Sequence, residues 1–249
     1  MTHFLVDSNL WAPKGINTAF SLRSGGSSAG PYSSFNVGIQ VGDELAVVAK
    51  NRAQLEALLS LPRAPQWLHQ VHGTRVHDFS KCTSLESNII ADAAVTRRAG
   101  VVLTIQVADC LPVLFAAEDG SVIGAAHAGW RGLVAGVLEN TVARMQCAPQ
   151  FLHAWLGPCI GPTYFEVGSE VRAAFLEAGD DGAGFCLNAQ GRWHCNLLTL
   201  ARGRLQKLGL KHVSGGHWCT ATDPEKFFSH RRDQCTGRMV ALIWKDVII

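Results

Sequence analysis

The sequence predicts an α+β fold in which mixed β-sheets are flanked by helices. The stretch 101–132, VVLTIQVADCLPVLFAAEDGSVIGAAHAGWRG, contains three apolar segments with the length of strands. Helical patterns occur elsewhere, at 43–60, 133–145 and 197–208. Strands, helices and hairpins follow one another without the regular strand–helix alternation of a parallel α/β fold, so an α+β arrangement is favoured.

The composition indicates one globular unit with a sizeable core. The chain has 249 residues, of which 47% are hydrophobic and 17% are charged. This length suits one large domain or two small ones, and because no internal repeat or linker is visible we expect a single domain over 1–249. The net charge of +2 gives no reason to expect nucleic acid or an anionic membrane surface as a partner.

The same composition favours a cytoplasmic protein with reduced thiols. The apolar runs are shorter than a membrane span, and the first residues, MTHFLVDSNLW, lack the basic and apolar regions of a signal peptide. Eight cysteines are spread along the chain without a C-x-x-C pair, a pattern typical of unpaired thiols in a reducing compartment. The oligomeric state is not indicated.

The N-terminal part is predicted to contain a strand at 16–21 and a helix at 43–60. Pro62 lies just beyond the end of the helix. Asn51 and Arg52, in the middle of the helix, are expected to face solvent. The apolar face of the helix is expected to consist of Leu45, Val48, Leu55, Leu58 and Leu59.

A loop rich in glycine and serine, RSGGSSAGP at 23–31, separates these two elements. Clusters of this kind usually mark turns, so a surface loop is the favoured interpretation. The alternative is a loop that closes on a ligand and offers its backbone N–H groups to an anion.

The segment 66–74, QWLHQVHGT, is predicted to be a strand that ends at Gly73. It carries His69 and His72. Residues three apart in a strand point to opposite faces, so at most one of the two imidazoles should enter a shared site. Residues 75–79 continue or pair with this strand, 81–88 form a polar connection, and 91–96 lead into the central stretch.

The central stretch places a thiol and an imidazole at strand ends. Asp109, Cys110 and Pro112 interrupt the apolar pattern after the strand 101–107. The segments 113–117 and 121–126 are expected to pair as a hairpin around Glu118-Asp119-Gly120. This hairpin delivers His127 close to Cys110, and a loop with two glycines then carries Arg131.

The C-terminal half alternates short elements with turns. We expect helices at 133–145, 169–178 and 197–208, the last ending at Gly209. Strands are expected at 151–156 and 238–244. The remaining features are a rigid turn at 157–162, a hairpin of 185–187 with 193–195 around Gly191, and an irregular segment at 217–228.

The candidate functional residues are His72, Cys110 and His127. Two imidazoles and a thiolate suit zinc, with a fourth position open for water or substrate. Each residue comes from its own strand end, as is common in catalytic sites. From the residues alone, a buried cysteine with two unrelated histidines remains the alternative.

Several motifs resemble the YfiH-like family, whose members are described as laccase-domain proteins, polyphenol oxidases or purine nucleoside phosphorylases. The resemblance spans nearly the whole chain, and the motifs together are specific although each alone is weak. They are RSGGS at 23–27, SFNVG at 34–38, HQVHG at 69–73, ADCLP at 108–112, HAGWRG at 127–132, GPCIG at 157–161 and FFSHRRD at 227–233.

The resemblance implies a zinc site with His72, Cys110 and His127 as ligands, and an α+β fold shared with the deamidase domain of cytotoxic necrotizing factor toxins. One position differs from the family pattern, because His230 precedes the paired arginines where the family favours tyrosine. No role is therefore assigned to His230.

The activity that the resemblance implies is phosphorolysis of adenosine, inosine and S-methyl-5'-thioadenosine, with Cys110, His127 and Arg131 as catalytic residues. The reaction needs an anion site, and a guanidinium suits phosphate because it donates two parallel hydrogen bonds. Arg131 is the first choice for phosphate. Weaker candidates for substrate or phosphate binding, for which surface contacts are the alternative, are Arg23, Asn36, Arg231 and Arg232.

Other activities stay open to different degrees. A zinc nucleobase deaminase of the usual kind shows H-x-E and P-C-x-x-C, and both are absent here, so adenosine deamination would need another arrangement. Ten histidines without an H-x-H pair argue against a multicopper oxidase, although a single Cu²⁺ also suits a His₂Cys site.

Two further classes compete with the phosphorylase. The first is a cysteine hydrolase or amidase that edits peptidoglycan precursors, with Cys110 as the nucleophile and His127 as the base. The second is a metal-stabilised binding protein with little catalysis of its own.

Overall fold

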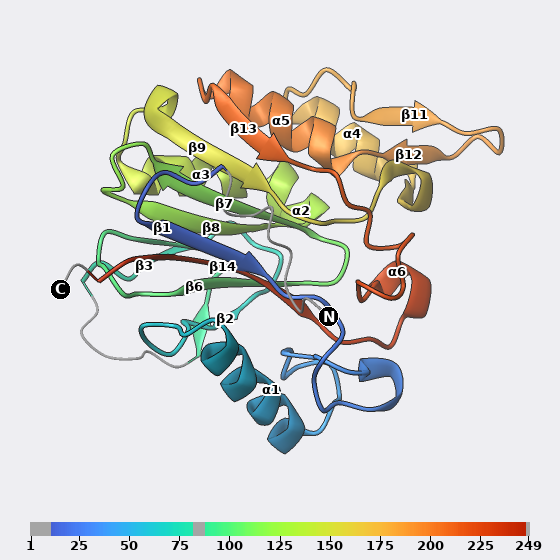
Figure 1. Ribbon diagram of the computed structural model, residues 1–249. Helices are drawn as coiled ribbons and strands as arrows, with labels where there is room; N and C mark the ends of the chain where they lie inside the picture. Colours follow the sequence, from blue (N-terminus) through green and yellow to red (C-terminus); the bar gives the residue numbers. More distant parts are fainter. Residues whose placement is uncertain (1–10, 82–87, 248–249) are drawn as a thin grey trace.

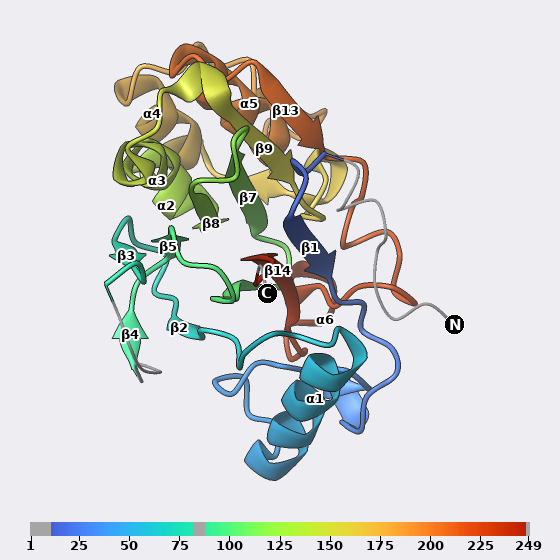
Figure 2. The same ribbon diagram turned by 60° about the vertical axis from the view of Figure 1, so that its left-hand side comes forward.

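The computed structural model describes residues 11–81 and 88–247, which are arranged in four layers (Figures 1 and 2). Helix α1 (Leu45–Leu58) covers one face of a three-stranded sheet. A six-stranded sheet packs on the other face of that sheet, and helices α2 to α5 cover its far side. This architecture confirms the predicted α+β class. The N-terminal residues 1–10, and most of the polar connection predicted at 81–88, lie outside the described residues.

The six-stranded sheet forms the centre of the molecule and is mixed. Its outer pairs, β13 with β9 and β5 with β3, run parallel, whereas the inner strands are antiparallel. The order across the sheet is β13 (His212–Gly215), β9 (Leu152–Leu156), β7 (Leu111–Ala117), β8 (Ile123–Ala128), β5 (Ala93–Thr96) and β3 (Val76–Asp78).

The other sheets are smaller. The three-stranded sheet is antiparallel and has β14 (Met239–Lys245) between β1 (Ile16–Phe20) and β6 (Leu103–Val107). Strands β2 (Leu68–His69) and β4 (Ile89–Ile90) pair in parallel. A second three-stranded sheet has the order β10 (Glu166–Val167), β12 (Trp193–Cys195) and β11 (Phe185–Leu187), and it contains the predicted hairpin of β11 and β12.

The predicted central hairpin is confirmed in its register. Strands β7 and β8 pair antiparallel, with Leu111 opposite Ala128 and Ala116 opposite Ile123. Gly120 closes the turn with a positive φ of 69° and donates its N–H to the carbonyl of Ala117 at 2.8 Å. Cys110 directly precedes β7, and His127 lies near the end of β8. The hairpin therefore brings the two side chains to the same end of the paired strands.

Both faces of β7 are buried, because the central sheet lies between two cores. Leu111, Val113 and Phe115 pack toward the helices, and Leu114 packs toward the three-stranded sheet. This explains why the strand reads as a continuous apolar run and not as an alternating one. A third core lies between the three-stranded sheet and α1.

The predicted helices at 43–60, 169–178 and 197–208 are present, whereas the region 128–145 differs and the short helix at 230–233 was not predicted. The sequence predicted a loop at 128–132 and a single helix at 133–145, and this prediction was wrong. The chain instead forms α2 (Trp130–Val134) and α3 (Val137–Met145), separated at Gly136, whose φ is 96°. A residue with this left-handed conformation cannot continue an α-helix. The other helices are α4 (Ser169–Glu177), α5 (Leu197–Lys207) and α6 (His230–Asp233), with short 3₁₀ turns at 30–32, 149–151 and 162–164.

The inner face of α1 also differs from the prediction. Leu45 and Leu58 are 64% and 48% exposed, whereas Asn51 is fully buried. The Asn51 side chain donates to the carbonyl of Asn36 at 2.8 Å and accepts from the N–H of Ser27 at 2.8 Å. The loop 23–37 passes beneath the helix, and its buried backbone groups need a hydrogen-bonding partner. That requirement explains why a polar residue occupies a core position.

The segment 66–74 is not one long strand. Leu68 and His69 pair with β4 as β2, and Gln66 forms an isolated bridge to Leu103. The chain then turns through Val71 to Gly73. His72 has a φ of 61°, which takes it out of the strand conformation. The short strands β4 and β13 were not predicted, because two and four residues carry little periodic signal.

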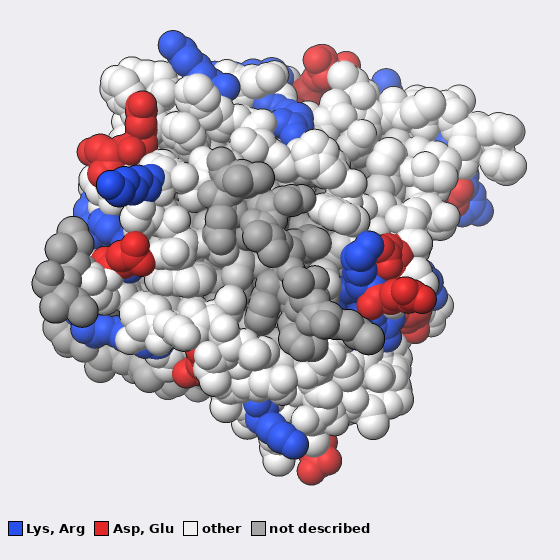
Figure 3. Space-filling model, in the orientation of Figure 1, with Lys and Arg blue, Asp and Glu red and all other residues white. Residues whose placement is uncertain are grey.

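Two further features concern the helices and the charged surface. In the described residues, no helix combines the length and the apolar character needed to cross a membrane. On the face shown in Figure 3, the described basic and acidic side chains form small groups, several of them mixed, and no continuous basic surface is visible there.

Candidate functional site

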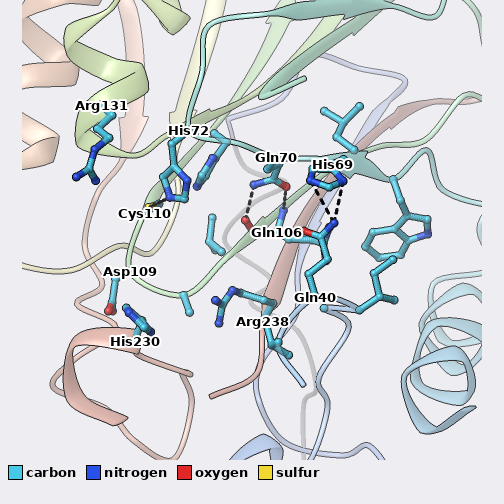
Figure 4. A pocket seen from close by; sticks show the side chains of 18 of the residues that line it. Gln40, His69, Gln70, His72, Gln106, Asp109, Cys110, Arg131, His230 and Arg238 are labelled. Carbon is cyan, nitrogen blue, oxygen red and sulfur yellow. Dashed lines mark hydrogen bonds between the residues drawn. The ribbon is translucent and has the colours of Figure 1, made fainter. Parts of the chain in front are cut away.

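A pocket of about 870 Å³ opens at the edge of the central sheet where β7 and β8 bring Cys110 and His127 (Figure 4). Its walls come from segments that are far apart in the sequence. They are the loop after residue 37, the segment around β2, the connection between β6 and β7, helices α2 and α6, and the residue that precedes β14.

His72, Cys110 and His127 lie together in this pocket. One ligand atom from each lies within 4.8 Å of the other two. The Sγ of Cys110 is 3.7 Å from Nε2 of His72, and the two imidazole rings meet edge to face with centroids 4.8 Å apart. His127 is buried, Cys110 is partly exposed and His72 is exposed. The group therefore has one open side, which faces the pocket.

Asp92 holds this arrangement in place, and the sequence analysis did not identify it. Asp92 directly precedes β5 in the sequence. Its carboxylate is fully buried and accepts a hydrogen bond from Nδ1 of His127 at 2.8 Å. It also accepts backbone N–H groups from Val71, His72 and Gly73 at 3.1, 2.8 and 2.7 Å. One side chain thus orients the ring of His127 and shapes the turn that presents His72. With Nδ1 bound to Asp92, Nε2 of His127 is the nitrogen left for a ligand.

Gly129 leaves the space that the three side chains occupy. A Cβ atom at this position would lie 2.9 Å from Sγ of Cys110 and 3.0 Å from Cδ2 of His72. Both contacts are tighter than ordinary packing allows. The HAGWRG motif therefore needs glycine at this position because the side chains of Cys110 and His72 approach its backbone closely. Its φ of −63° would be accessible to any residue.

The electrostatics favour a thiolate beside an imidazolium. Burial opposes ionisation of Cys110, but the charge of His127 and hydrogen bonds from both histidines lower the pKa of Cys110 to about 6. Burial likewise opposes the charge on His127, and the Cys110 thiolate together with Asp92 raises the pKa of His127 to about 9. Burial also acts against the charge of Asp92, yet the hydrogen bonds from His127 and Gly73 leave its pKa below the usual value.

Two of the predicted phosphate-binding residues line the pocket. Arg131 is exposed at the start of α2, where its guanidinium lies 4.4 Å from the centre of the Trp130 ring. Arg231 is more constrained. It packs over Phe165 and donates Nη1 to the carbonyls of Tyr164 and Glu166 at 3.2 and 3.0 Å.

The other predicted binding residues do not belong to the pocket lining. Arg23 donates to the carbonyls of Ser33 and Pro224. Arg232 donates to backbone carbonyls and pairs with Asp233 at 2.7 Å. Their guanidinium groups hold loops together.

Asn36 is also outside the pocket lining and fully buried. Its Oδ1 accepts from the backbone N–H groups of Gly38 and Arg238, at 2.9 and 2.8 Å. Within the predicted loop 23–31, the N–H groups of Gly26, Ser27 and Ser28 likewise have partners inside the protein.

Several pocket residues were missed by the sequence analysis. Arg238 lines the middle of the pocket, and Asp109 lies beside Cys110. His69 lines the pocket too, but its ring lies 2.9 Å from Nε2 of Gln40 and does not join the Cys110 group. A polar residue at a strand end could have indicated Asp92 and Asp109. For Arg238, nothing in the local pattern distinguishes it from a surface arginine.

Comparisons with known proteins agree with this structure. A curated protein of Xylella fastidiosa named purine nucleoside phosphorylase is 47% identical over 243 residues, which is 93% of each chain. The Escherichia coli protein named purine nucleoside phosphorylase YfiH is 45% identical over 93% of this chain and 95% of its own. A crystal structure of a Neisseria meningitidis protein superposes with a TM-score of 0.93 at 39% identity and covers 99% of this chain and 100% of that one.

These likenesses extend over the whole described pocket and not over one motif. Residues 17–246 match the family described as multi-copper polyphenol oxidoreductase laccase. This range includes the turn of His72, the hairpin of Cys110 and His127, and the segment before β14. The chain therefore belongs to this laccase-domain family, which confirms the YfiH-like assignment made from the motifs.

Proposed function

We propose that this protein is a zinc-dependent purine nucleoside phosphorylase. The observation that carries the proposal is a His₂Cys group with one open side, placed in a pocket of about 870 Å³ that is also lined by arginines. Such a pocket is large enough for a nucleoside and a phosphate together. The names of the Xylella and Escherichia coli relatives support the same activity.

The residues present fit a zinc ion. Two imidazoles and a thiolate are the donors that zinc prefers, and three protein ligands with an open position are typical of catalytic zinc. The hydrogen bond from His127 to Asp92 is the arrangement that commonly orients a ligating imidazole. When bound, zinc supplies positive charge that stabilises negative charge at its open position.

In phosphorolysis, a phosphate oxygen forms a bond to the anomeric carbon of the ribose. The bond from that carbon to the base nitrogen breaks, and the base leaves with the electron pair and takes up a proton. The pocket arginines hold the phosphate by charge-assisted hydrogen bonds. His72, Cys110 and His127 would hold the zinc ion and thereby determine where in the pocket negative charge is stabilised. Asp92 keeps the ring of His127 in one orientation.

The proposed substrates are adenosine, inosine and S-methyl-5'-thioadenosine, and adenosine deamination is a possible second reaction of the same site. The test is to incubate the purified metal-loaded protein with each nucleoside, with and without phosphate, and to resolve the products by chromatography. We expect adenine and ribose 1-phosphate from adenosine only when phosphate is present. Adenine released equally without phosphate, or no base released at all, would contradict the phosphorylase. Inosine formed from adenosine would reveal the deaminase.

One observation favours a second candidate, a cysteine hydrolase or amidase acting on peptidoglycan precursors. Cys110, whose pKa is lowered, would be the nucleophile, and the adjacent His127 would be the base. The carboxylate of Asp92 would orient the base, as in a catalytic triad. A zinc-bound thiolate is a poor nucleophile, so the two functions differ in how Cys110 reacts with iodoacetamide.

Peptide mapping of the alkylated protein separates these functions. The phosphorylase predicts that Cys110 is protected in the metal-loaded protein and is alkylated after chelation, with activity lost on chelation and restored by zinc. The exposed Cys186 serves as an internal control because it should react in both states. Full alkylation of Cys110 in metal-replete, active protein would favour the hydrolase.

A multicopper oxidase is less well supported by the donor atoms. Within residues 11–81 and 88–247, His72, Cys110 and His127 form the one group of three or more side chains placed to hold a metal. A multicopper oxidase needs several copper centres, each with its own ligands. A single copper ion in the same His₂Cys group is the version of this activity that the residues permit.

A further inference from the structure

Arg238 lines the pocket and is held in place by its own loop. It directly precedes β14, and in Figure 4 its guanidinium points into the pocket between the Asp109 side and the Gln40 side. Nη1 donates to the carbonyls of Thr236 and Gly237, at 3.1 and 3.0 Å. These two bonds fix Nη1 and leave Nε and Nη2 without a hydrogen-bonding partner among the described residues.

The loop 34–38 is shaped to hold this arginine. The Oδ1 of Asn36 accepts from the backbone N–H of Arg238 at 2.8 Å, and the same oxygen accepts from Gly38 at 2.9 Å. A Cβ atom on Gly38 would lie 2.7 Å from Cγ of Arg238. The SFNVG motif therefore supplies a hydrogen bond to the backbone of Arg238 and the empty space for its side-chain stem.

The guanidinium of Arg238 forms no ion pair with the residues that the structure describes. In the described part of the chain, no carboxylate lies within ion-pair distance of its guanidinium. The nearby acid, Asp109, uses Oδ1 to accept from the Thr220 hydroxyl at 2.5 Å and Oδ2 to accept from the N–H of Arg231 at 2.6 Å. Burial lowers the pKa of Arg238, and the charges of Cys110, Asp109 and Cys235 act in the opposite direction.

Arg131 offers a different kind of contact. It is exposed, and its guanidinium lies over the face of the Trp130 ring. In the view of Figure 4, Arg131 and Arg238 lie on opposite sides of Cys110. A guanidinium that is partly desolvated and already fixed binds an anion more strongly than a solvated one, because less freedom and less hydration are lost on binding.

We infer that Arg238, and not Arg131, is the main binding residue for the phosphate co-substrate, and that Asn36 and Gly38 position it. The unpartnered Nε and Nη2 groups lie on one edge of the guanidinium and form the fork that recognises two oxygens of a tetrahedral oxyanion. The identification of the oxyanion as phosphate rests on the proposed phosphorylase, whereas the anion site itself rests on the geometry of Arg238.

The test compares four variants of the metal-loaded protein, R238Q, R238K, R131Q and R75Q. Arg75 is exposed and outside the pocket lining, so R75Q controls for the loss of one positive charge. Binding of inorganic phosphate is measured by calorimetry, and the KM values for phosphate and for nucleoside are measured separately. Metal content and thermal unfolding show whether each variant is folded. R238K keeps the stem that packs on Gly38, so it decides the question if R238Q does not fold.

We expect R238Q to raise the Kd and the KM for phosphate roughly 10- to 100-fold, as for the loss of a hydrogen bond between charged groups, with the nucleoside KM changed less than about threefold. R238K should be intermediate because it keeps the charge without the fork. R131Q should have a much smaller effect, and R75Q none. Unchanged phosphate binding in both Arg238 variants, or a larger loss in R131Q, would overturn the inference.

The same experiment separates this inference from the proposed function. If phosphate binds in an Arg238-dependent manner but no nucleoside is cleaved, the anion site stands and the phosphorylase is wrong. If wild-type protein cleaves nucleosides with phosphate and the Arg238 variants keep the wild-type KM for phosphate, the phosphorylase stands and the assignment of Arg238 is wrong.

Discussion

The two sides of the pocket are built in different ways. The side with Cys110 and His127 stands on the central sheet, where a tight hairpin and one buried carboxylate, Asp92, fix the geometry. The side with Arg238 is built from two loops, 34–38 and 234–238, that lie next to each other. Backbone N–H groups of both loops donate to the side chain of Asn36, and the missing side chain at Gly38 leaves room for the stem of Arg238. The first side offers two imidazoles and a thiol as donors that could hold a metal, and the second offers a fixed positive charge.

Because of this difference, substitutions on the two sides should have different effects. A metal site depends on a few irreplaceable donor atoms, so single substitutions there should have very large effects on one property, metal affinity. The arginine side depends on many weaker contacts, so its substitutions should divide into effects on anion binding and effects on stability.

The largest effect is expected for C110A. The substitution removes the single thiolate donor from the His₂Cys group, and we expect metal affinity to fall on the order of 1000-fold. Elemental analysis after dialysis should show about one metal ion per wild-type chain and almost none in the variant. The matched control is C186A, which removes an exposed thiol outside the pocket lining. Metal retained in C110A would exclude Cys110 as a ligand.

A smaller but still large loss is expected for D92N. The amide can no longer offer a charged acceptor to Nδ1 of His127 and to the N–H groups of the turn at His72. Loss of such an orienting partner costs about 10- to 100-fold in metal affinity. Competition with a chelator of known affinity measures it. An affinity equal to that of wild type would show that the hairpin alone orients His127.

Metal affinity should also depend on pH in a defined direction. In the metal-free protein the thiolate and Asp92 raise the pKa of His127 to about 9, so below that pH a proton must leave His127 before it can bind a metal. Affinity should therefore rise with pH, by about tenfold for each unit between pH 7 and pH 9. Below about pH 6, where Cys110 also takes up a proton, the dependence should steepen. Chelator competition at several pH values checks the slope, and a flat profile would contradict the proposed ion pair.

The sequence predicted the metal side of the pocket better than the arginine side, for physical reasons. An apolar run, a turn of Asp119-Gly120 and a second apolar run allow one simple pairing, so the positions of Cys110 and His127 follow from local rules. His72 was included for its chemistry, although the strand assumed for it ends at His69. The turn that actually presents His72 depends on Asp92, about twenty residues away, which no local pattern can show.

On the arginine side, local patterns do not show which polar groups face the pocket. Arg23, Asn36 and Arg232 stand in motifs that suggest binding, yet their polar groups satisfy the backbone of neighbouring loops. Asn51 reads as a solvated position and is fully buried. Whether a polar residue binds a ligand or a loop depends on which distant carbonyls the fold brings to it. That information appears only once both loops are placed.

R23Q should separate stability from anion binding. The substitution removes hydrogen bonds to the carbonyls of Ser33 and Pro224 and the contact with the Phe228 ring, without touching the pocket lining. We expect the free energy of unfolding to fall by about 1–3 kcal/mol. The KM for phosphate should stay at the wild-type value. Denaturant unfolding and kinetics at varied phosphate measure the two quantities, and a raised phosphate KM with unchanged stability would place Arg23 in the anion site.

The smallest effect on the metal is expected for H69A. His69 and His72 both line the pocket, but the ring of His69 contacts Gln40 at 2.9 Å on the side away from Cys110. Because it shares no partner with the His₂Cys group, its removal should leave metal affinity within about twofold of wild type. The KM for the nucleoside is the property that should change, since His69 and Gln40 offer polar groups to whatever fills that part of the pocket. Chelator competition and nucleoside kinetics on the same preparation test both statements. Loss of metal in H69A would mean that the turn at His72 is not fixed by Asp92 and that the two histidines can exchange roles.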